Sequence, residues 1–187
     1  MKKFVLTVLA LVVVASPAFA QFGDISGYAD AAGTSCNIVD NQPFAFIDVF
    51  FLHKNTSGAT ASQFTVTLTG GSTFTYINST EAPGMLRLGD ANNDMSLAYG
   101  GCLTGDFLIV TVRYLGNGGS AACSRVTLTP APSTPIPGEV AMVDCSVPSG
   151  ELRIPATGQA IINPDLTCQC NVTVQEKTWG GIKALYR

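Results

Sequence analysis

Most of this chain consists of short segments in which apolar and polar residues alternate with a period of two. The clearest is FTVTLT at residues 64–69, with three apolar residues on one face and three Thr on the other. This pattern is typical of an antiparallel strand with one buried and one solvent face. Gly- and Pro-rich turns separate such segments, and none has the 3.6-residue period of a helix. We therefore predict an all-β chain folded as an antiparallel β-sandwich.

Two longer segments, residues 44–53 and 107–115, are almost entirely apolar, which predicts central strands buried on both faces. Shorter strands are expected at residues 73–77, 85–88, 95–99, 125–128, 139–143, 159–162 and 168–174. Residues 129–138 hold four Pro and are similar to a linker. The 49 residues that follow are too few for a separate core, so we expect a stiff loop within one domain.

The N-terminus has the pattern of an export signal. Lys2 and Lys3 precede an apolar run at residues 4–15, and Ala18-Phe19-Ala20 offers the small residues that signal peptidase requires. We expect residues 1–20 to be a signal peptide of bacterial type, residues 21–174 the sandwich domain and residues 175–187 a C-terminal tail. The alternative is a retained membrane anchor. No later segment is apolar enough to span a bilayer, which predicts a secreted, periplasmic or cell-surface protein without a transmembrane segment after cleavage.

All six cysteines follow this signal. They are Cys36, Cys102, Cys123, Cys145, Cys168 and Cys170. An even number in an exported chain predicts a disulfide framework, and fifteen pairings remain open. The alternative is a metal site. The single close pair Cys168-Gln169-Cys170 is weak support for it, because zinc sites usually have paired C-x-x-C spacings. If residues 168–174 form a strand, both cysteines of this pair lie on one face and each bridges to a different segment.

The charge of the chain excludes one class of partner. It has 10 Lys and Arg against 13 Asp and Glu, without a basic cluster, and removal of residues 1–20 removes two of the Lys. An acidic chain without a basic patch is not expected to bind nucleic acid.

One segment is a weak candidate for a calcium site. Asp90, Asn92 and Asp94 supply oxygen ligands at the first, third and fifth positions of a calcium-binding loop. The loop motif then requires Gly and Glu, where this chain has Met95 and Gly101. The alternative is a polar turn between strands. No other cofactor is predicted.

The sequence gives little sign of catalysis, and we predict that the chain is not an enzyme. His53 is the single His, and the motifs of serine hydrolases, zinc proteases and phosphate-binding loops are missing. A secreted hydrolase built on His53 or on two acids remains a less favoured alternative. No catalytic residue is assigned.

The sequence offers several segments that could contact a ligand. The candidate stacking platforms for sugars are Tyr28, Tyr76, Tyr99 and Tyr114. Of these, Tyr76 and Tyr114 are expected to face the core. The first loops to consider are residues 89–94, 100–106 and 116–122. The tail carries the sole Trp, Trp179, and could form a short helix from Thr178 that docks on the sandwich, stays free or acts as an address.

Several segments together resemble a family of uncharacterised secreted proteins of environmental bacteria. They are GYAD at residues 27–30, GATASQF at 58–64, LAYGGC at 97–102, EVAMVDC at 139–145, CQC at 168–170 and the TWGGIKALYR ending at 178–187. This resemblance implies no activity. The ATASQF strand and the Gly-bounded strands that follow are also similar to cohesin-like sandwiches of cell-surface assemblies, which implies an Ig/cohesin-like fold.

These observations together predict a secreted, non-catalytic sandwich module for binding or adhesion outside the cytoplasm, with a carbohydrate or a protein as ligand. The alternative of another class is a structural subunit of a surface assembly, which would expose an unprotected edge strand and multimerise.

Overall fold

The computed structural model describes residues 22–147 and 150–170. Within these residues the chain forms strands and no helix, and thus contains no helix able to cross a membrane. The strands are β1 (Asp24–Tyr28), β2 (Asn37–Ile38), β3 (Pro43–Thr69), β4 (Thr75–Glu81), β5 (Leu86–Asp90), β6 (Asp94–Asn117), β7 (Ser124–Thr129), β8 (Ala141–Asp144), β9 (Leu152–Arg153), β10 (Ala156–Thr157) and β11 (Gln159–Ile162). The predicted signal peptide and tail lie outside the described residues and stay predictions.

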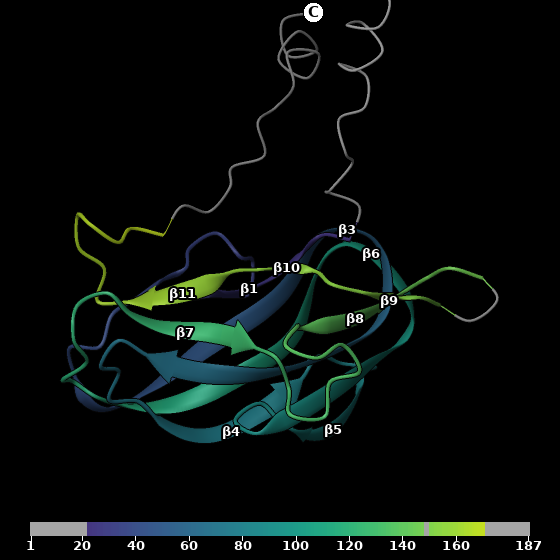
Figure 1. Ribbon diagram of the computed structural model, residues 1–187. Coiled ribbons are helices and arrows are strands. Elements are labelled where there is room, and N and C mark those ends of the chain that lie inside the picture. The colour runs from purple at the N-terminus through teal and green to yellow at the C-terminus, as the bar shows by residue number, and fades with distance from the viewer. Residues whose placement is uncertain (1–21, 148–149, 171–187) are drawn as a thin grey trace, which may run out of the picture.

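The strands form two layers that share one long strand (Figure 1). In the first layer β3 pairs antiparallel with β6, and β6 pairs with β4 and β5 on its other side. The free side of β3 pairs first with β1 and then with β8, which carries β9. The last five residues of β3 pass into the second layer and pair with β7, which continues through β11 to β2. The predicted β-sandwich is confirmed, with two short parallel pairings, β1–β10 and β2–β11.

The first layer is long because β3 and β6 continue through irregular backbone. We predicted that the strand at residues 44–53 ends at His53, and this is wrong: β3 runs to Thr69. Its pairing with β6 shifts register after His53 and again after Thr56, with Asn55 at a φ of 54°. Such bulges let a strand bend without ending, so the polar residues after His53 mark a bend instead of a terminus.

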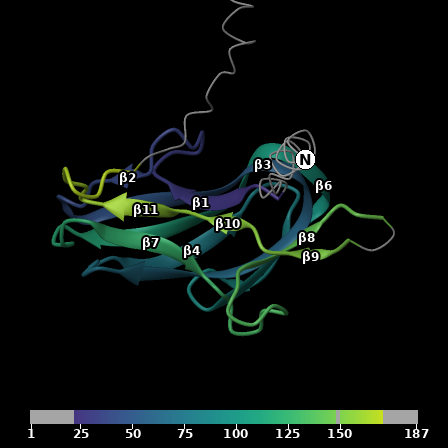
Figure 2. The same ribbon diagram turned by 45° about the horizontal axis from the view of Figure 1, so that its top comes forward.

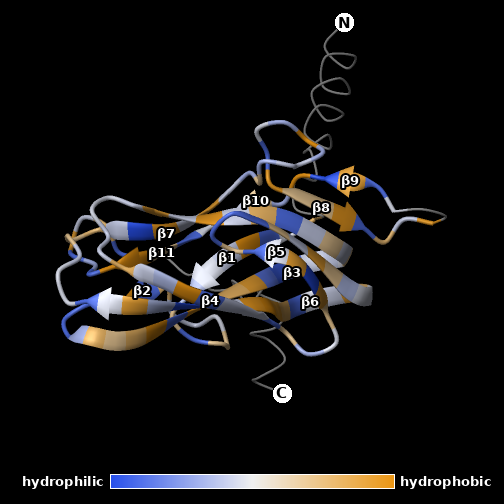
Figure 3. Ribbon diagram, turned by 90° about the horizontal axis from the view of Figure 1, so that it is seen from below, coloured by the Kyte–Doolittle hydropathy of each residue, from blue (hydrophilic) through white to orange (hydrophobic). Residues whose placement is uncertain are grey.

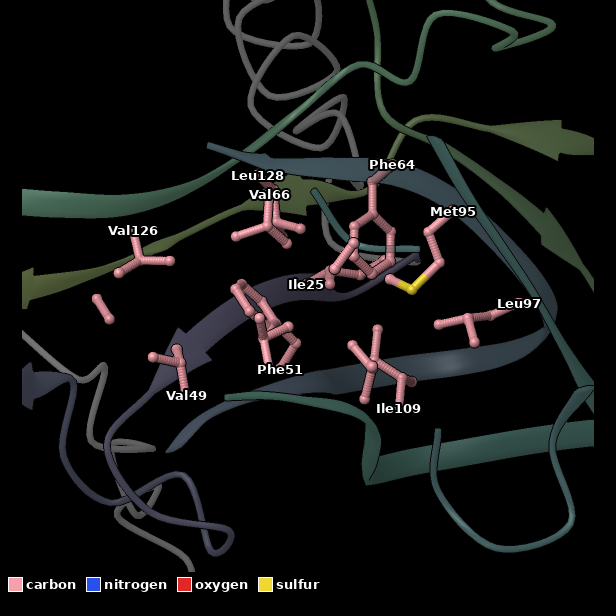
Figure 4. Close-up of a cluster of buried hydrophobic side chains, with 14 of the residues drawn as sticks. Ile25, Val49, Phe51, Phe64, Val66, Met95, Leu97, Ile109, Val126 and Leu128 are labelled. Carbon is pink, nitrogen blue, oxygen red and sulfur yellow. The ribbon is translucent and has the colours of Figure 1, made fainter. Parts of the chain in front are cut away.

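The core lies between the two layers and follows the predicted alternation in part. Thr65 is buried although it was predicted on the solvent face, and Phe44 and Phe46, predicted to be buried, are exposed at the start of β3. Phe64 and Val66 of the FTVTLT segment are buried, whereas the hydroxyls of Thr67 and Thr127 are 3.0 Å apart, paired across β3 and β7. Figure 4 shows side chains from both layers meeting around Phe51. Burial of each such apolar side chain contributes about 1.5–3 kcal/mol to the stability of the fold.

All six cysteines form disulfides, each with a Cα–Cα distance of 5.7 Å, which confirms the predicted framework over a metal site. The pairs are Cys36–Cys170, Cys102–Cys145 and Cys123–Cys168. Cys168 and Cys170 bridge to different segments, as predicted, but they lie in irregular chain after β11 and not in a strand. The C-terminal end of the described chain is therefore fastened to both β2 and β7.

A buried carboxylate joins the loops at one end of the sandwich. Asp40 is 3% exposed, and its two oxygens accept hydrogen bonds from the backbone N–H of Gly118 at 2.9 Å and of Ser120 at 3.0 Å. Asn163 accepts from the Asp40 N–H at 2.8 Å. Burial by itself raises the pKa of Asp40, but the hydrogen bonds from Ser120 and Gly118 outweigh it and lower the pKa below its usual value.

Candidate functional site

Strands β8 and β9 lie at one end of the first layer (Figure 3). An apolar groove crosses the outer face of the layer at this end. Strand register places one residue from each of five strands in a continuous row across it, namely Leu86, Ala98, Ala61, Val143 and Leu152. A second row, two residues along each strand, consists of Leu88, Ser96, Gln63 and Ala141. Residues i and i+2 of a strand share a face, so both rows line this groove.

The groove has a floor of small residues and walls of large ones. Ala98 and Ala61 occupy its centre, on β6 and β3, while Leu86 and Leu88 on β5 are 73% and 75% exposed. Pro135, from the loop between β7 and β8, lines the groove as well. Its volume is about 430 Å³. From β5 to β8 there are three steps between neighbouring strands of about 4.8 Å each, or about 14 Å. This width fits an α-helix with its side chains, about 10–12 Å across.

Charged residues on the strands that form the groove, and in the segments next to these strands, are already paired. Arg153 donates from Nε to Asp144 Oδ2 at 2.9 Å and forms a second ion pair with Glu151. The Ser146 hydroxyl and N–H and the Glu151 N–H also donate to Asp144, and these bonds hold the pKa of its carboxyl well below the usual range. Arg87 of β5 donates from Nε to Glu81 at 3.0 Å. Among the residues that line the groove Arg87 is the one with a charged side chain, and its charge is neutralised by Glu81. A ligand entering the groove therefore meets mainly apolar surface.

The calcium candidates lie beside this groove, in the turn between β5 and β6. Asp90 Oδ1 accepts the backbone N–H of Asn92 at 3.0 Å. The two oxygens of Asp94 accept from the Gln63 amide at 3.2 Å and the Ser133 N–H at 3.1 Å, and bonds from Ser133 lower its pKa. These bonds are those of a polar turn, and the calcium hypothesis stays a prediction.

A different cluster of candidate metal ligands occurs in the described ranges. Cys123, Asp165 and Cys168 are the one group there with three potential ligand atoms close together. Both of its sulfur atoms belong to the Cys123–Cys168 disulfide, and a sulfur in a disulfide is not the thiolate that binds metals. The cluster does not form a metal site in this oxidised state.

His53 is part of the core and not of a cleft. Its side chain is fully buried, with Nε2 2.9 Å from the Phe22 carbonyl oxygen and its ring centroid 5.4 Å from that of Phe107. Burial lowers the pKa of His53, which keeps the ring neutral. A strand that ended at residue 53, as we predicted, would place His53 at the rim of the sandwich; this is wrong because β3 continues well past it. A buried base is out of reach of a substrate.

The tyrosines and loops proposed as ligand contacts lie mostly elsewhere. Tyr114 faces the core and Tyr76 is half-buried, as predicted, but Tyr28 and Tyr99 are 5% and 4% exposed and are not sugar-stacking platforms. Residues 100–106 belong to β6 instead of a loop. Of residues 116–122, the first two end β6 and the other five belong to the loop that leads to β7.

The groove itself was not predicted from the sequence. The signal present in the chain was Leu86-Arg87-Leu88, where alternation predicts that both Leu share a face. It does not say which face, and the Leu side chains point outward because Met85 and the neighbouring Leu97 and Met95 fill the core side.

The fold is that of cohesin modules. The chain is similar to the cohesin module of a family 33 glycoside hydrolase from Clostridium perfringens, with a TM-score of 0.53, 9% identity, and coverage of 78% of this chain and 99% of that one. It is also similar to a type II cohesin domain from the cellulosome of Acetivibrio cellulolyticus, with a TM-score of 0.53, 13% identity, and coverage of 79% and 98%. No protein-family model and no curated protein matches the sequence. The predicted cohesin-like fold is confirmed, and the resemblance to a family with a TWGGIKALYR-type tail stays a prediction.

Proposed function

We propose that this chain is an exported, non-catalytic module that binds a partner protein by taking one of its helices into the apolar groove. The observation that carries this proposal is the pair of Leu side chains, Leu86 and Leu88, about three-quarters exposed beside a floor of Ala. Exposed apolar surface next to paired charges marks protein interfaces.

The shape of the groove supports a helix as the occupant. It is wide enough for one helix and floored by two Ala, so a helix can approach the sheet closely while the Leu walls contact its sides. A sugar is a poor match for this surface, because of the residues lining the groove only Ser62, Gln63, Arg87 and Ser96 have polar side chains. Gln63 and Arg87 already donate to Asp94 and Glu81.

The three disulfides and the fold support the other parts of the proposal. Disulfides form and persist outside the reducing cytoplasm, in agreement with the predicted signal peptide. The two similar structures are a module of a glycoside hydrolase and a domain of a cellulosome, and this chain has the same fold. His53 is fully buried and lines neither the apolar groove nor the cavity along β1, β10 and β11, which disfavours a hydrolase built on it.

The experiment compares Leu86→Asp with a matched surface variant. The oxidised mature chain is immobilised, exposed to the proteins secreted by the producing bacterium, and each retained protein is then measured against it in isolation. We expect Leu86→Asp to weaken the binding of the partner at least about 30-fold, because central apolar contacts each contribute about 2 kcal/mol or more.

Leu166→Asp is the control, since Leu166 is 93% exposed and lies in the segment after β11, away from the groove. It should bind as the wild type does. Equal binding by Leu86→Asp and wild type would refute the proposal. Concentration-dependent self-association of the purified chain, abolished by Leu86→Asp, would favour the structural assembly subunit instead.

A further inference from the structure

Figure 2 shows β1, β10 and β11 side by side. A second, larger cavity lies along these three strands. Its volume is about 730 Å³, within the range of ligand sites. We call it the polar groove and define it by Asp24, Arg125, Thr157, Gln159 and Gln169. It does not share a lining residue with the apolar groove.

The walls of the polar groove are covalently fixed. Gln169 lies between Cys168 and Cys170, which are bonded to Cys123 and Cys36. The Cys170 N–H also donates to Asn37 Oδ1 at 3.3 Å, which fixes this segment against β2. A site that is rigid before binding loses little conformational entropy on binding, which favours affinity.

Several side chains in the groove retain unused hydrogen-bonding capacity. The Arg125 guanidinium and the Gln159 and Gln169 amides have no partner within residues 22–147 and 150–170. Asp24 Oδ2 accepts the Ser26 hydroxyl at 2.6 Å, while Oδ1 has no partner among the same residues. The guanidinium donates, the carboxylate accepts and the amides do both, and each of these planar groups presents two polar atoms side by side.

We propose that the polar groove binds a neutral carbohydrate chain. Two adjacent hydroxyls on a sugar ring can each donate and accept, so a carboxylate, amide or guanidinium fork can contact both at once. Arg125 and Asp24 carry one charge of each sign, so the groove has no excess charge to attract a strongly charged ligand.

The backbone around the groove argues against an extended peptide as the ligand. Such a peptide would add to the edge of β1 that faces away from β3, through a row of backbone hydrogen bonds. The carbonyl oxygens of Gly23 and Ile25 on this edge already accept the N–H groups of Ala156 and Gly158, at 3.1 and 3.0 Å. Gly27 alone is left, and it is buried.

Affinity in this groove depends on hydrogen bonds more than on stacking. The Tyr28 ring lines the groove but is 5% exposed, and Lys54 Nζ lies 4.9 Å from its centroid. The assay must therefore detect weak binding. Native electrophoresis of the oxidised mature chain through gels that contain soluble β-glucan, xylan, galactomannan or starch meets this need.

We expect at least one of these polysaccharides to retard the chain. Arg125→Ala and Gln159→Ala should each lower the affinity for that polysaccharide, measured from the retardation, about tenfold. Each substitution removes hydrogen bonds to the sugar. Gln42→Ala is the matched control, an exposed amide outside the groove. Gln42→Ala and Leu86→Asp should both behave as wild type, so failure of the helix-binding proposal leaves this one intact.

Three outcomes would overturn the proposal. The first is that none of the four polysaccharides retards the wild type. The second is retardation that Arg125→Ala and Gln159→Ala both leave unchanged while thermal unfolding shows them folded. The third is binding of an extended peptide from a peptide array that these two variants abolish, which would assign the polar groove to a protein ligand.

Discussion

Replacing Asp40 by Ala should destabilise the sandwich far more than its size suggests. Asp40 is buried and accepts the backbone N–H groups of Gly118 and Ser120. Ala removes both bonds. The Ser120 bond is buried, so its N–H is left unsatisfied at a cost of about 1–3 kcal/mol, and the part-buried Gly118 bond adds a smaller loss. We therefore expect a loss of about 3 kcal/mol in the free energy of unfolding.

Urea denaturation of the oxidised chain, followed by circular dichroism, measures this loss. For a transition with a slope of about 2 kcal/mol per molar, the midpoint should fall by about 1.5 M. The melting temperature should fall by about 6–12 °C for a domain of this size.

Asp30→Ala is the control that separates the effect of burial from the effect of the number of hydrogen bonds lost. Asp30 also accepts several hydrogen bonds, including the Ser35 N–H at 2.8 Å and the Thr34 hydroxyl at 3.0 Å, but most of them are exposed to water. Water can replace them, so the loss should stay near 1 kcal/mol or below. Equal destabilisation by Asp30→Ala and Asp40→Ala would refute the reasoning.

Two further predictions concern covalent and protonation effects. Replacing Cys36 and Cys170 together by Ser opens a bridge between residues 134 positions apart and should cost about 3–5 kcal/mol of stability, measured by urea denaturation, whereas an unchanged midpoint would contradict the pairing. His53 has a lowered pKa when folded, so the unfolded chain takes up a proton first as the pH falls below about 6.5 and the folded state loses stability. His53→Phe should reduce the dependence of the melting temperature on pH between pH 6.5 and 5. An unaltered pH dependence would show that other groups cause it.

Local patterns predicted part of the core correctly and failed at Thr65, which is buried, and at Phe44 and Phe46, which are exposed. Alternation placed Phe64 and Val66 in the core and Thr67 on the outer face, because a side chain's face follows from its position in the strand. It failed after His53, where register shifts carry β3 through a polar run. Bulges depend on pairing with β6, which the residues of β3 alone do not encode.

The candidate site was beyond sequence reasoning for a related reason. The apolar groove exists because Leu86 and Leu152, 66 residues apart in the chain, stand at the two ends of one row across five strands. This row depends on the pairing of β8 with β3, a long-range contact. The disulfide pairing was open for the same reason, since spacing alone does not bring Cys36 to Cys170.

Methyl NMR of the oxidised chain during titration with helical peptides tests the central claim most directly. The peptides are selected from a library of displayed amphipathic helices by binding to the chain, and the Leu methyl signals are assigned by single substitutions. The account predicts that a bound helix shifts the methyl signals of Leu86, Leu88 and Leu152 and leaves those of Leu166 in place. Selected helices that shift Leu166 and leave these three unmoved would contradict it, as would a library that yields no binding helix.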